Sequence, residues 1–430
     1  MRMNYFVHHA PPDRAGLAVR RRHVLYVEGY DPLGTQWYYD LFRRTCERFR
    51  RLWPLTLTLS PLVIDSAEFA HWRVELGGAN WQVATRYEFL RMESFIRSDT
   101  NQTSLRQLAS GLGWCLGDAQ SGVLWRIFRT AGWRFALHLV CFQLLLLAWL
   151  ASAGGIGLAV GCALRLVGLP VWLAGAAGLP AAVAALFVLR PLFERWRVVQ
   201  ICACWVTLRK FGRGRATWID RVVEAGAQRL LAAARANDVD EIVLVGHSTG
   251  GVVAAAIAAR ALDVDPDLGK RGPRLALLTL GSVMPAVALH PAAGRMRAIV
   301  AALATAKNLT WVDCQSRKDV MCFFNFDPVD DIGVKVGTER CNPLVWRVSF
   351  KDMIAPQNYN RFRWDHFRVH YQYIMGGERP APYDYILVVG GPMPIGQWPT
   401  RDRVFAAAMM GEKAAKTERS PARAAVGVAP

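Results

Sequence analysis

The stretch that decides the fold runs from Glu241 to Ala256 and reads EIVLVGHSTGGVVAAA. Its apolar beginning predicts a buried strand, and its alanine-rich end predicts a helix. Between them lies the pattern G-x-S-x-G, with glycines at Gly246 and Gly250 and a serine at Ser248. Glycines permit a turn too tight for a Cβ, which would hold the Ser248 hydroxyl exposed above the sheet as a nucleophile elbow.

The chain around this stretch alternates between predicted strands and helices. Alternation of this kind predicts an α/β fold with a mostly parallel sheet covered by helices. After the elbow helix, which we expect to end near Leu262, strands are expected at Arg274–Leu280, Leu309–Cys314 and Leu344–Phe350, with a helix at Ala292–Thr305. In the first half we expect strands at His23–Glu28, Pro54–Ile64, Trp72–Leu76 and Trp81–Tyr87, and helices at Gly34–Trp53, over much of Glu88–Gly132, and at Val198–Asn237 with a break around Gly212–Gly214.

An apolar run interrupts this alternation. Between Phe135 and Leu189 the only formal charge is Arg165. About 20 apolar residues cross a bilayer as a helix, so the run predicts an inserted transmembrane hairpin. We expect the spans at Phe135–Ala153 and Val171–Leu189, joined by a turn around Gly161–Pro170.

The flanks of the hairpin predict its orientation. Arginines precede the first span and follow the second, whereas the turn carries only Arg165. The positive-inside rule therefore predicts a multi-pass membrane protein with two helices and both termini in the cytoplasm, in a bacterial inner membrane. The alternatives are a hairpin buried in a soluble core and one lying on the membrane surface.

The domain organisation follows from the insertion. It comprises a basic N-terminal segment (1–22), the first part of the α/β domain (23–130), the hairpin (131–190), the second part with the catalytic elements (191–395), and a tail (396–430) that we expect to be disordered from Gly411.

Composition restricts the partners. A formal charge of +18 on a chain with 20% charged residues predicts an anionic neighbour. The basic residues gather near the hairpin flanks and the tail, without the interleaved aromatics of a nucleic-acid site, so the lipid bilayer is favoured over nucleic acid. The nine cysteines are scattered, without a CxxC pair, which predicts reduced structural thiols and no metal site. No cofactor motif is present, and protein partners stay open.

The elbow sequence Gly246-His247-Ser248-Thr249-Gly250-Gly251 resembles the α/β-hydrolase superfamily, in particular its lipases and esterases. The resemblance covers roughly residues 20–90 and 198–390 and extends to uncharacterised bacterial membrane proteins with a lipase-like domain, through Leu280-Gly281-Ser282 and Tyr383-Asp384-Tyr385. It implies a Ser, acid, His order along the chain.

This order selects candidates for the acid and the base. Asp319 follows the strand Leu309–Cys314 and is the preferred acid, with Asp327 as the second choice. His370 begins the sequence HYQY, which resembles a lipase motif, and is preferred over His366 as the base. The two histidines are four residues apart, but no glutamate between them completes a zinc motif.

Two backbone N–H groups are expected to bind the oxyanion. One belongs to Thr249, and the other to Tyr30, in the loop after an early strand. Lipases usually have His-Gly where this chain has Glu28-Gly29. Glu28 is alternatively a buried carboxylate paired with an arginine, and Ser282 is interpreted as structural.

Together these features predict a membrane-anchored serine hydrolase that cleaves an acyl ester, thioester or lipid at the cytoplasmic membrane face. An acyltransferase would use the same residues. The alternative from another class is a hydrolase-like fold that serves as an inactive membrane scaffold or partner-binding protein, which the departure at Glu28-Gly29 favours.

Overall fold

The computed structural model describes residues 19–78, 81–130, 132–215 and 217–400. Nine strands form its centre: β1 (Arg21–Val27), β2 (Thr56–Leu59), β3 (Val63–Ile64), β4 (Phe69–Gly77), β5 (Gln82–Leu90), β6 (Glu241–His247), β7 (Arg274–Leu280), β8 (Leu309–Gln315) and β9 (Leu344–Arg347). They form one sheet in the order β2-β4-β5-β1-β6-β7-β8-β9, and β3 pairs with β4.

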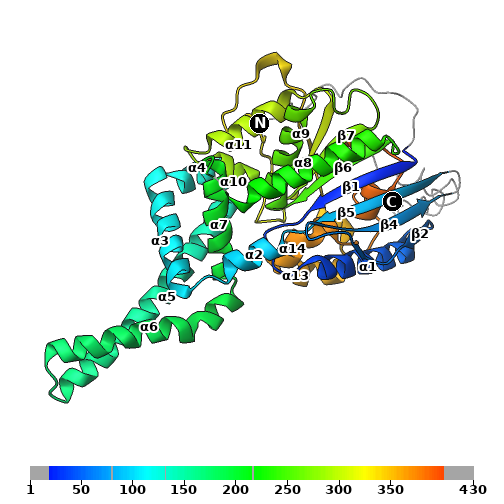
Figure 1. Ribbon diagram of the computed structural model, residues 1–430. Helices are drawn as coiled ribbons and strands as arrows, with labels where there is room; N and C mark the ends of the chain where they lie inside the picture. Colours follow the sequence, from blue (N-terminus) through cyan, green and yellow to red (C-terminus); the bar gives the residue numbers. More distant parts are fainter. Residues whose placement is uncertain (1–18, 79–80, 131, 216, 401–430) are drawn as a thin grey trace, which may run out of the picture.

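The sheet is mixed and mostly parallel. The neighbours from β5 through β1, β6, β7 and β8 to β9 all pair in parallel. The strands β2, β3 and β5 pair antiparallel to β4. Helices cover both faces of this sheet (Figure 1), which confirms the predicted α/β class.

The helices of the α/β domain are α1 (Thr35–Leu52), α8 (Trp218–Ala236), α9 (Gly250–Val264), α10 (Met284–Ala288), α11 (Gly294–Thr305), α12 (Phe350–Met353), α13 (Pro356–Phe362), α14 (His366–Tyr371) and α15 (Tyr385–Gly390). Short 3₁₀ turns lie at Gly337–Glu339, Gln372–Ile374 and Ile395–Thr400. The remaining helices are α2 (Glu93–Thr100), α3 (Ser104–Ser121), α4 (Val123–Arg129), α5 (Trp133–Leu166), α6 (Val171–Arg195) and α7 (Val198–Gly212).

The central strands are apolar on both sides. In β6, Ile242 and Leu244 belong to a core shared with α8, α9 and α11. The alternate residues Val243 and Val245 belong to a second core shared with α1 and α15. A parallel strand buried on both faces needs an unbroken apolar sequence, which explains why the run before Gly246 shows no alternation.

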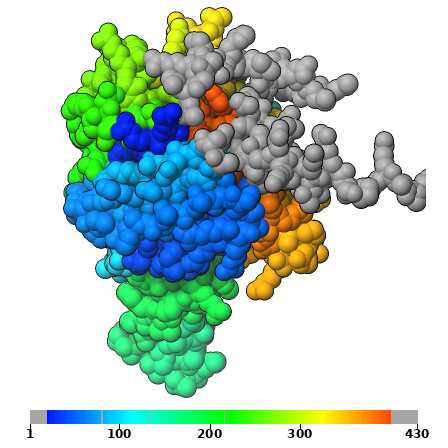
Figure 2. Space-filling model, turned by 90° about the vertical axis from the view of Figure 1, so that its right-hand side faces the viewer, coloured from blue at the N-terminus to red at the C-terminus, as the bar shows by residue number. Residues whose placement is uncertain are grey.

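The apolar insertion forms a two-helix arm. Helices α5 and α6 pack against each other and extend away from the α/β domain (Figure 1), and Figure 2 shows the arm below the domain. Both helices are long and apolar enough to cross a membrane. The predicted turn is wrong in extent, because α5 continues through Gly161 to Leu166 and only residues 167–170 join the helices.

The glycines of α5 serve helix packing rather than a turn. A Cβ added at Gly157 would lie 2.6 Å from the Gly178 carbonyl oxygen of α6. A Cβ at Gly161 would lie 3.4 Å from the Ala174 carbonyl oxygen. Small residues at such contacts let two helices approach closely, as they do in membrane proteins.

The root of the arm is embedded in protein. Phe135 of α5 is 2% exposed, and its ring contacts the rings of Trp205 and Phe323. The beginning of the predicted span Phe135–Ala153 therefore faces side chains of the domain.

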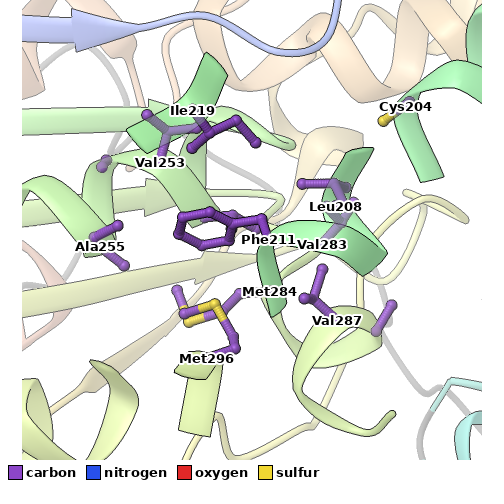
Figure 3. Close-up of a cluster of buried hydrophobic side chains, with 14 of the residues drawn as sticks. Cys204, Leu208, Phe211, Ile219, Val253, Ala255, Val283, Met284, Val287 and Met296 are labelled. Carbon is purple, nitrogen blue, oxygen red and sulfur yellow. The ribbon is translucent and has the colours of Figure 1, made fainter. Parts of the chain in front are cut away.

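Helix α7 joins the arm to the α/β domain. Its residues Leu208 and Phe211 lie among Val283, Met284 and Val287 near α10, as Figure 3 shows. Beside this apolar contact, the Arg209 side chain of α7 pairs with Asp118 of α3 at 3.2 Å. The Gln143 amide of α5 also donates to Asp118, at 3.2 Å. Three helices at the foot of the arm, the end nearest the α/β domain, are thus joined by one buried polar cluster.

Four of the predicted strands differ clearly from those observed. The strand predicted at Trp72–Leu76 already begins at Phe69. The stretch Pro54–Ile64 forms two strands that both pair with β4, because Pro61 between them has no N–H to donate. The strand β5 continues to Leu90, so the helical region begins later than Glu88. The strand β9 ends at Arg347, and Phe350 begins a short helix instead.

The predictions for the two ends of the chain fall only in part on described residues. The strand β1 begins at Arg21, within the segment assigned to the basic N-terminus, and residues 1–18 lie outside the described residues. The tail from Gly411, which we predict to be disordered, lies outside them as well.

A fully buried arginine joins the sheet to the C-terminal segment. Arg22 is 0% exposed, and its guanidinium donates to Glu241 at 2.8 Å. The same group donates to the carbonyl oxygens of Gly391 and Met393. Glu241 in turn accepts from the Ile395 N–H at 2.9 Å. Both charges are therefore paired and hydrogen-bonded where water is excluded.

Replacing Arg22 by leucine should lower the free energy of unfolding by about 3–5 kcal/mol, because it leaves a buried Glu241 carboxylate without its partner. The exposed neighbour Arg21, replaced by leucine, is the matched control and should change stability little. Denaturant unfolding of both variants measures the difference, and equal stabilities would contradict this account.

Candidate active site

The turn between β6 and α9 forces Ser248 into an unusual backbone conformation. Ser248 has φ +58°, the left-handed region that residues with a Cβ rarely adopt. A Cβ added at Gly250 would lie 2.3 Å from the Val27 carbonyl oxygen and 2.4 Å from that of Glu28. One added at Gly246 would lie 2.5 Å from the Gly250 carbonyl oxygen. The two glycines therefore permit a backbone contact that leaves Ser248 at the apex.

Backbone hydrogen bonds hold the apex in place. The Ser248 N–H donates to the Leu280 carbonyl at 2.9 Å, and its own carbonyl accepts from the Gly251 N–H at 3.1 Å. The Ser248 residue itself is half-buried. Its side chain thus sits at the end of β6 on a backbone that is fixed from both sides.

The structure brings Asp319 and His370 together. Asp319 follows β8, and its carboxylate accepts from His370 Nδ1 at 2.7 Å. Both side chains are buried. The other Asp319 oxygen accepts from the Met321 N–H at 2.9 Å, which fixes the carboxylate. Within the part of the chain that the structure describes, His370 Nε2 is buried and has no hydrogen-bond partner.

This pairing sets the tautomer of His370. Because the carboxylate only accepts, the proton of a neutral imidazole lies on Nδ1. The lone pair is then on Nε2, where it can accept a proton from a hydroxyl. The pair has the protonation pattern of a general base held by a carboxylate.

The second-choice residues lie elsewhere. Asp327 accepts two hydrogen bonds of 2.7 Å from Arg340 and also accepts from the Val329 N–H. These contacts stabilise its own loop. His366 is the exposed first residue of α14, whereas His370, one turn later, is buried. The structure therefore does not bring Asp327 or His366 to the pair.

His247 connects Ser248 to His370, and sequence reasoning missed this role. Its Nε2 donates to the His370 carbonyl at 3.0 Å, and the two rings lie 4.8 Å apart. Burial, together with the nearby His370, lowers the pKa of His247 to about 3. His247 is therefore neutral and fixes α14 beside the end of β6. The signal was its place in the motif, directly before Ser248.

The loop after β1 lies against the serine. A Cβ added at Gly29 would lie 3.4 Å from Ser248 Cβ and 3.8 Å from its Oγ. The Asp31 N–H donates to the Gly29 carbonyl at 2.8 Å and closes a tight turn around Tyr30. Among the described residues, neither the Tyr30 N–H nor the Thr249 N–H donates to another group. Two candidate oxyanion donors are thus unpaired close to Ser248.

Glu28 is a buried carboxyl, but its partner is not an arginine. One oxygen accepts from the Met92 N–H at 3.0 Å, and the other has no partner among the described residues. Burial, together with nearby Glu93, raises the pKa of Glu28 well above its usual value. Glu28 fixes the strand before Gly29 through Met92 and presents no ion pair to the site.

Ser282 lies beneath the elbow rather than in it. Its hydroxyl accepts from the Met284 N–H at 3.1 Å, and a Cβ added at Gly251 would lie 2.4 Å from its Oγ. These contacts agree with a structural interpretation. No group of three or more His, Cys, Asp or Glu side chains gathers into a possible metal site in the described ranges.

The stability of the protein should fall as the pH falls from about 6.5 towards 3. In that window His247 binds a proton when the chain is unfolded but stays neutral when it is folded. The free energy of unfolding therefore falls by up to about 1.4 kcal/mol for each pH unit. In the variant His247→Gln, which keeps a donor for the His370 carbonyl, the slope should be shallower. Denaturant unfolding between pH 4 and 7 measures the slopes, and equal slopes would contradict the neutral, buried assignment.

Comparisons with known proteins return no relative. No family model matches the chain, and neither a curated protein nor a solved structure matches it.

Proposed function

We propose that this protein is a membrane-anchored serine hydrolase that cleaves an acyl ester or thioester at the cytoplasmic face of a membrane. The observation that carries the proposal is the 2.7 Å contact between His370 Nδ1 and Asp319, with Nε2 unpaired and His247 joining His370 to the serine turn. Among the described residues His370 Nε2 makes no hydrogen bond to Ser248 Oγ, but His370 is joined through His247 to the turn of this strained, half-buried serine. A free base and a serine brought into contact when substrate binds are what nucleophilic acyl transfer needs.

The reaction has two halves. The Ser248 hydroxyl attacks the acyl carbonyl carbon while His370 Nε2 accepts its proton, and Asp319 stabilises the resulting imidazolium. The N–H groups of Thr249 and Tyr30 hold the negative oxygen. The carbon–oxygen or carbon–sulfur bond then breaks, and His370 returns the proton to the leaving group. Water repeats the sequence and releases the acid, whereas an alcohol in its place would make the protein an acyltransferase.

The arm has the dimensions of a membrane hairpin. From Val171 to Arg190, α6 is about 30 Å long, close to the thickness of the hydrocarbon core. Arg190 is held at the foot, where it donates to the Thr100 carbonyl at 3.2 Å. On α5, Trp149 lies at a similar distance along the arm, because its indole N–H donates to the Leu186 carbonyl of α6. The part of α5 that lies alongside this stretch of α6 is thus Trp149–Leu166, which begins later than the span predicted from hydropathy.

Exposure and charge agree with this placement. At the far end of the arm Leu166 is 88% exposed and Trp172 is 68% exposed, which water would penalise and lipid would not. The foot carries Arg190 and Arg195, whereas Arg165 is alone near the tip. The positive-inside rule then puts the foot and the α/β domain in the cytoplasm, as in a bacterial inner membrane.

A fluorophosphonate should label the solubilised wild-type protein, because the probe reacts with an activated serine. Labelling should disappear in Ser248→Ala and fall at least 100-fold in His370→Ala and Asp319→Asn, since removal of a triad member removes most of the activation. Asp327→Asn and Ser282→Ala are the controls and should label like the wild type. Folded wild-type protein that does not label would favour an inactive membrane scaffold instead.

A cysteine at the tip should be accessible only from the far side of the membrane. We expect Val167→Cys, with Cys141 and Cys162 replaced by serine, to react with an impermeant maleimide on intact spheroplasts. In the same background, Leu116→Cys on the exposed side of α3 should react only in inside-out vesicles. Reaction of both positions from one side would exclude a spanning hairpin.

A further inference from the structure

The chain enters the apolar arm at the start of α5, its first root, and leaves it at the start of α7, its second root. Each root contacts one of the two loops that lie beside the candidate site. The start of α5 contacts the loop that carries Asp319. The start of α7, directly after α6, contacts the loop that carries Tyr30. These contacts involve polar groups of the arm that anchoring alone would not need.

At the first root, Arg134 of α5 donates to the carbonyl oxygen of Arg317 at 2.8 Å. Arg317 is two residues before Asp319. The Phe135 ring lies 5.0 Å from the ring of Phe323, which follows the same loop. A Cβ added at Gly132 would lie 2.3 Å from the Phe323 ring, so the chain passes directly over it.

At the second root, Gln200 of α7 donates from its side-chain amide to the Tyr30 carbonyl at 2.7 Å. Arg197 precedes α7 and lies 3.9 Å from the Asp31 carboxylate. Its guanidinium also lies 4.5 Å above the Phe367 ring of α14. The Tyr30 hydroxyl donates to Asp99 at 3.0 Å, which holds the other end of this residue.

These contacts fix peptide planes that matter for an oxyanion. The Gly29 carbonyl is held by the Asp31 N–H, and the Tyr30 carbonyl is held by Gln200. With both planes held, the Tyr30 N–H keeps a fixed direction beside Ser248. An oxyanion donor acts only within about 2.7–3.1 Å of the developing charge, so a small rotation of this loop removes its effect.

We propose that Gln200 and Arg134 are positioning residues, and that the membrane arm is part of the frame of the active site rather than only an anchor. Gln200 holds the oxyanion loop, and Arg134 holds the loop of the catalytic acid. This inference rests on the proposed serine hydrolase activity and adds to it. It assigns a catalytic consequence to the packing of the arm.

The test uses the full-length protein in detergent micelles, with short p-nitrophenyl esters as substrate. Gln200→Leu should lower kcat about 10- to 100-fold with KM within about twofold, because the substrate still binds while the oxyanion donor is misplaced. Gln200→Glu keeps the shape but removes the donor, and should lower kcat as much. Gln228→Leu on α8, whose amide donates to Glu224 one turn earlier on the same helix, is the matched control and should leave kcat unchanged.

Arg134→Gln is tested beside Arg129→Gln, an exposed arginine of α4. Only the first should lower kcat, and only the first should slow fluorophosphonate labelling. Thermal unfolding of each variant identifies any that fails to fold. In a folded Gln200→Glu or Arg134→Gln protein, a wild-type kcat would overturn the inference. Wild-type protein that is not labelled would instead overturn the proposed function.

Discussion

The backbone contact at Gly250 is the constraint on which the rest of the site depends. The first turn of α9 lies so close to the end of β1 that a Cβ at Gly250 would be 2.3 Å from the Val27 carbonyl oxygen. That contact forces the preceding residues into a sharp turn and holds Ser248 at φ +58°. It also brings the loop after β1 against the serine, so one steric condition positions both Ser248 and the Tyr30 loop.

The rest of the α/β domain supports this contact from both sides. His247 uses the strand end to hold α14, and with it His370, near the serine. The buried pair of Arg22 and Glu241 joins the two central strands to the C-terminal segment. The arm adds a third support, because its two roots hold the loops of Asp319 and Tyr30. The hairpin is thus inserted at a position in the α/β domain where its two roots contact loops of the candidate site.

Local sequence predicted the features that depend on local chemistry, and tertiary contacts decided the others. The strand–turn–helix at Gly246–Gly250 and the two apolar helices follow from patterns within single segments. Spacing along the chain does not show that Asp319 lies against His370, nor that Asp327 pairs with Arg340 instead. The extent of α5 was missed because Gly157 and Gly161 suggest a turn in isolation, whereas they permit close packing against α6. His247, Gln200 and Arg134 were missed because their partners lie far away in the sequence.

The central claim is that Ser248 is a nucleophile whose oxyanion is held by the N–H groups of Thr249 and Tyr30. The most direct measurement is an experimental structure of the protein after reaction with a phosphonate. The account predicts phosphorus bonded to Ser248 Oγ and the phosphoryl oxygen within about 3 Å of both N–H groups. His370 Nε2 should face the serine oxygen. A phosphonate on another residue, or a phosphoryl oxygen directed away from Thr249 and Tyr30, would contradict it.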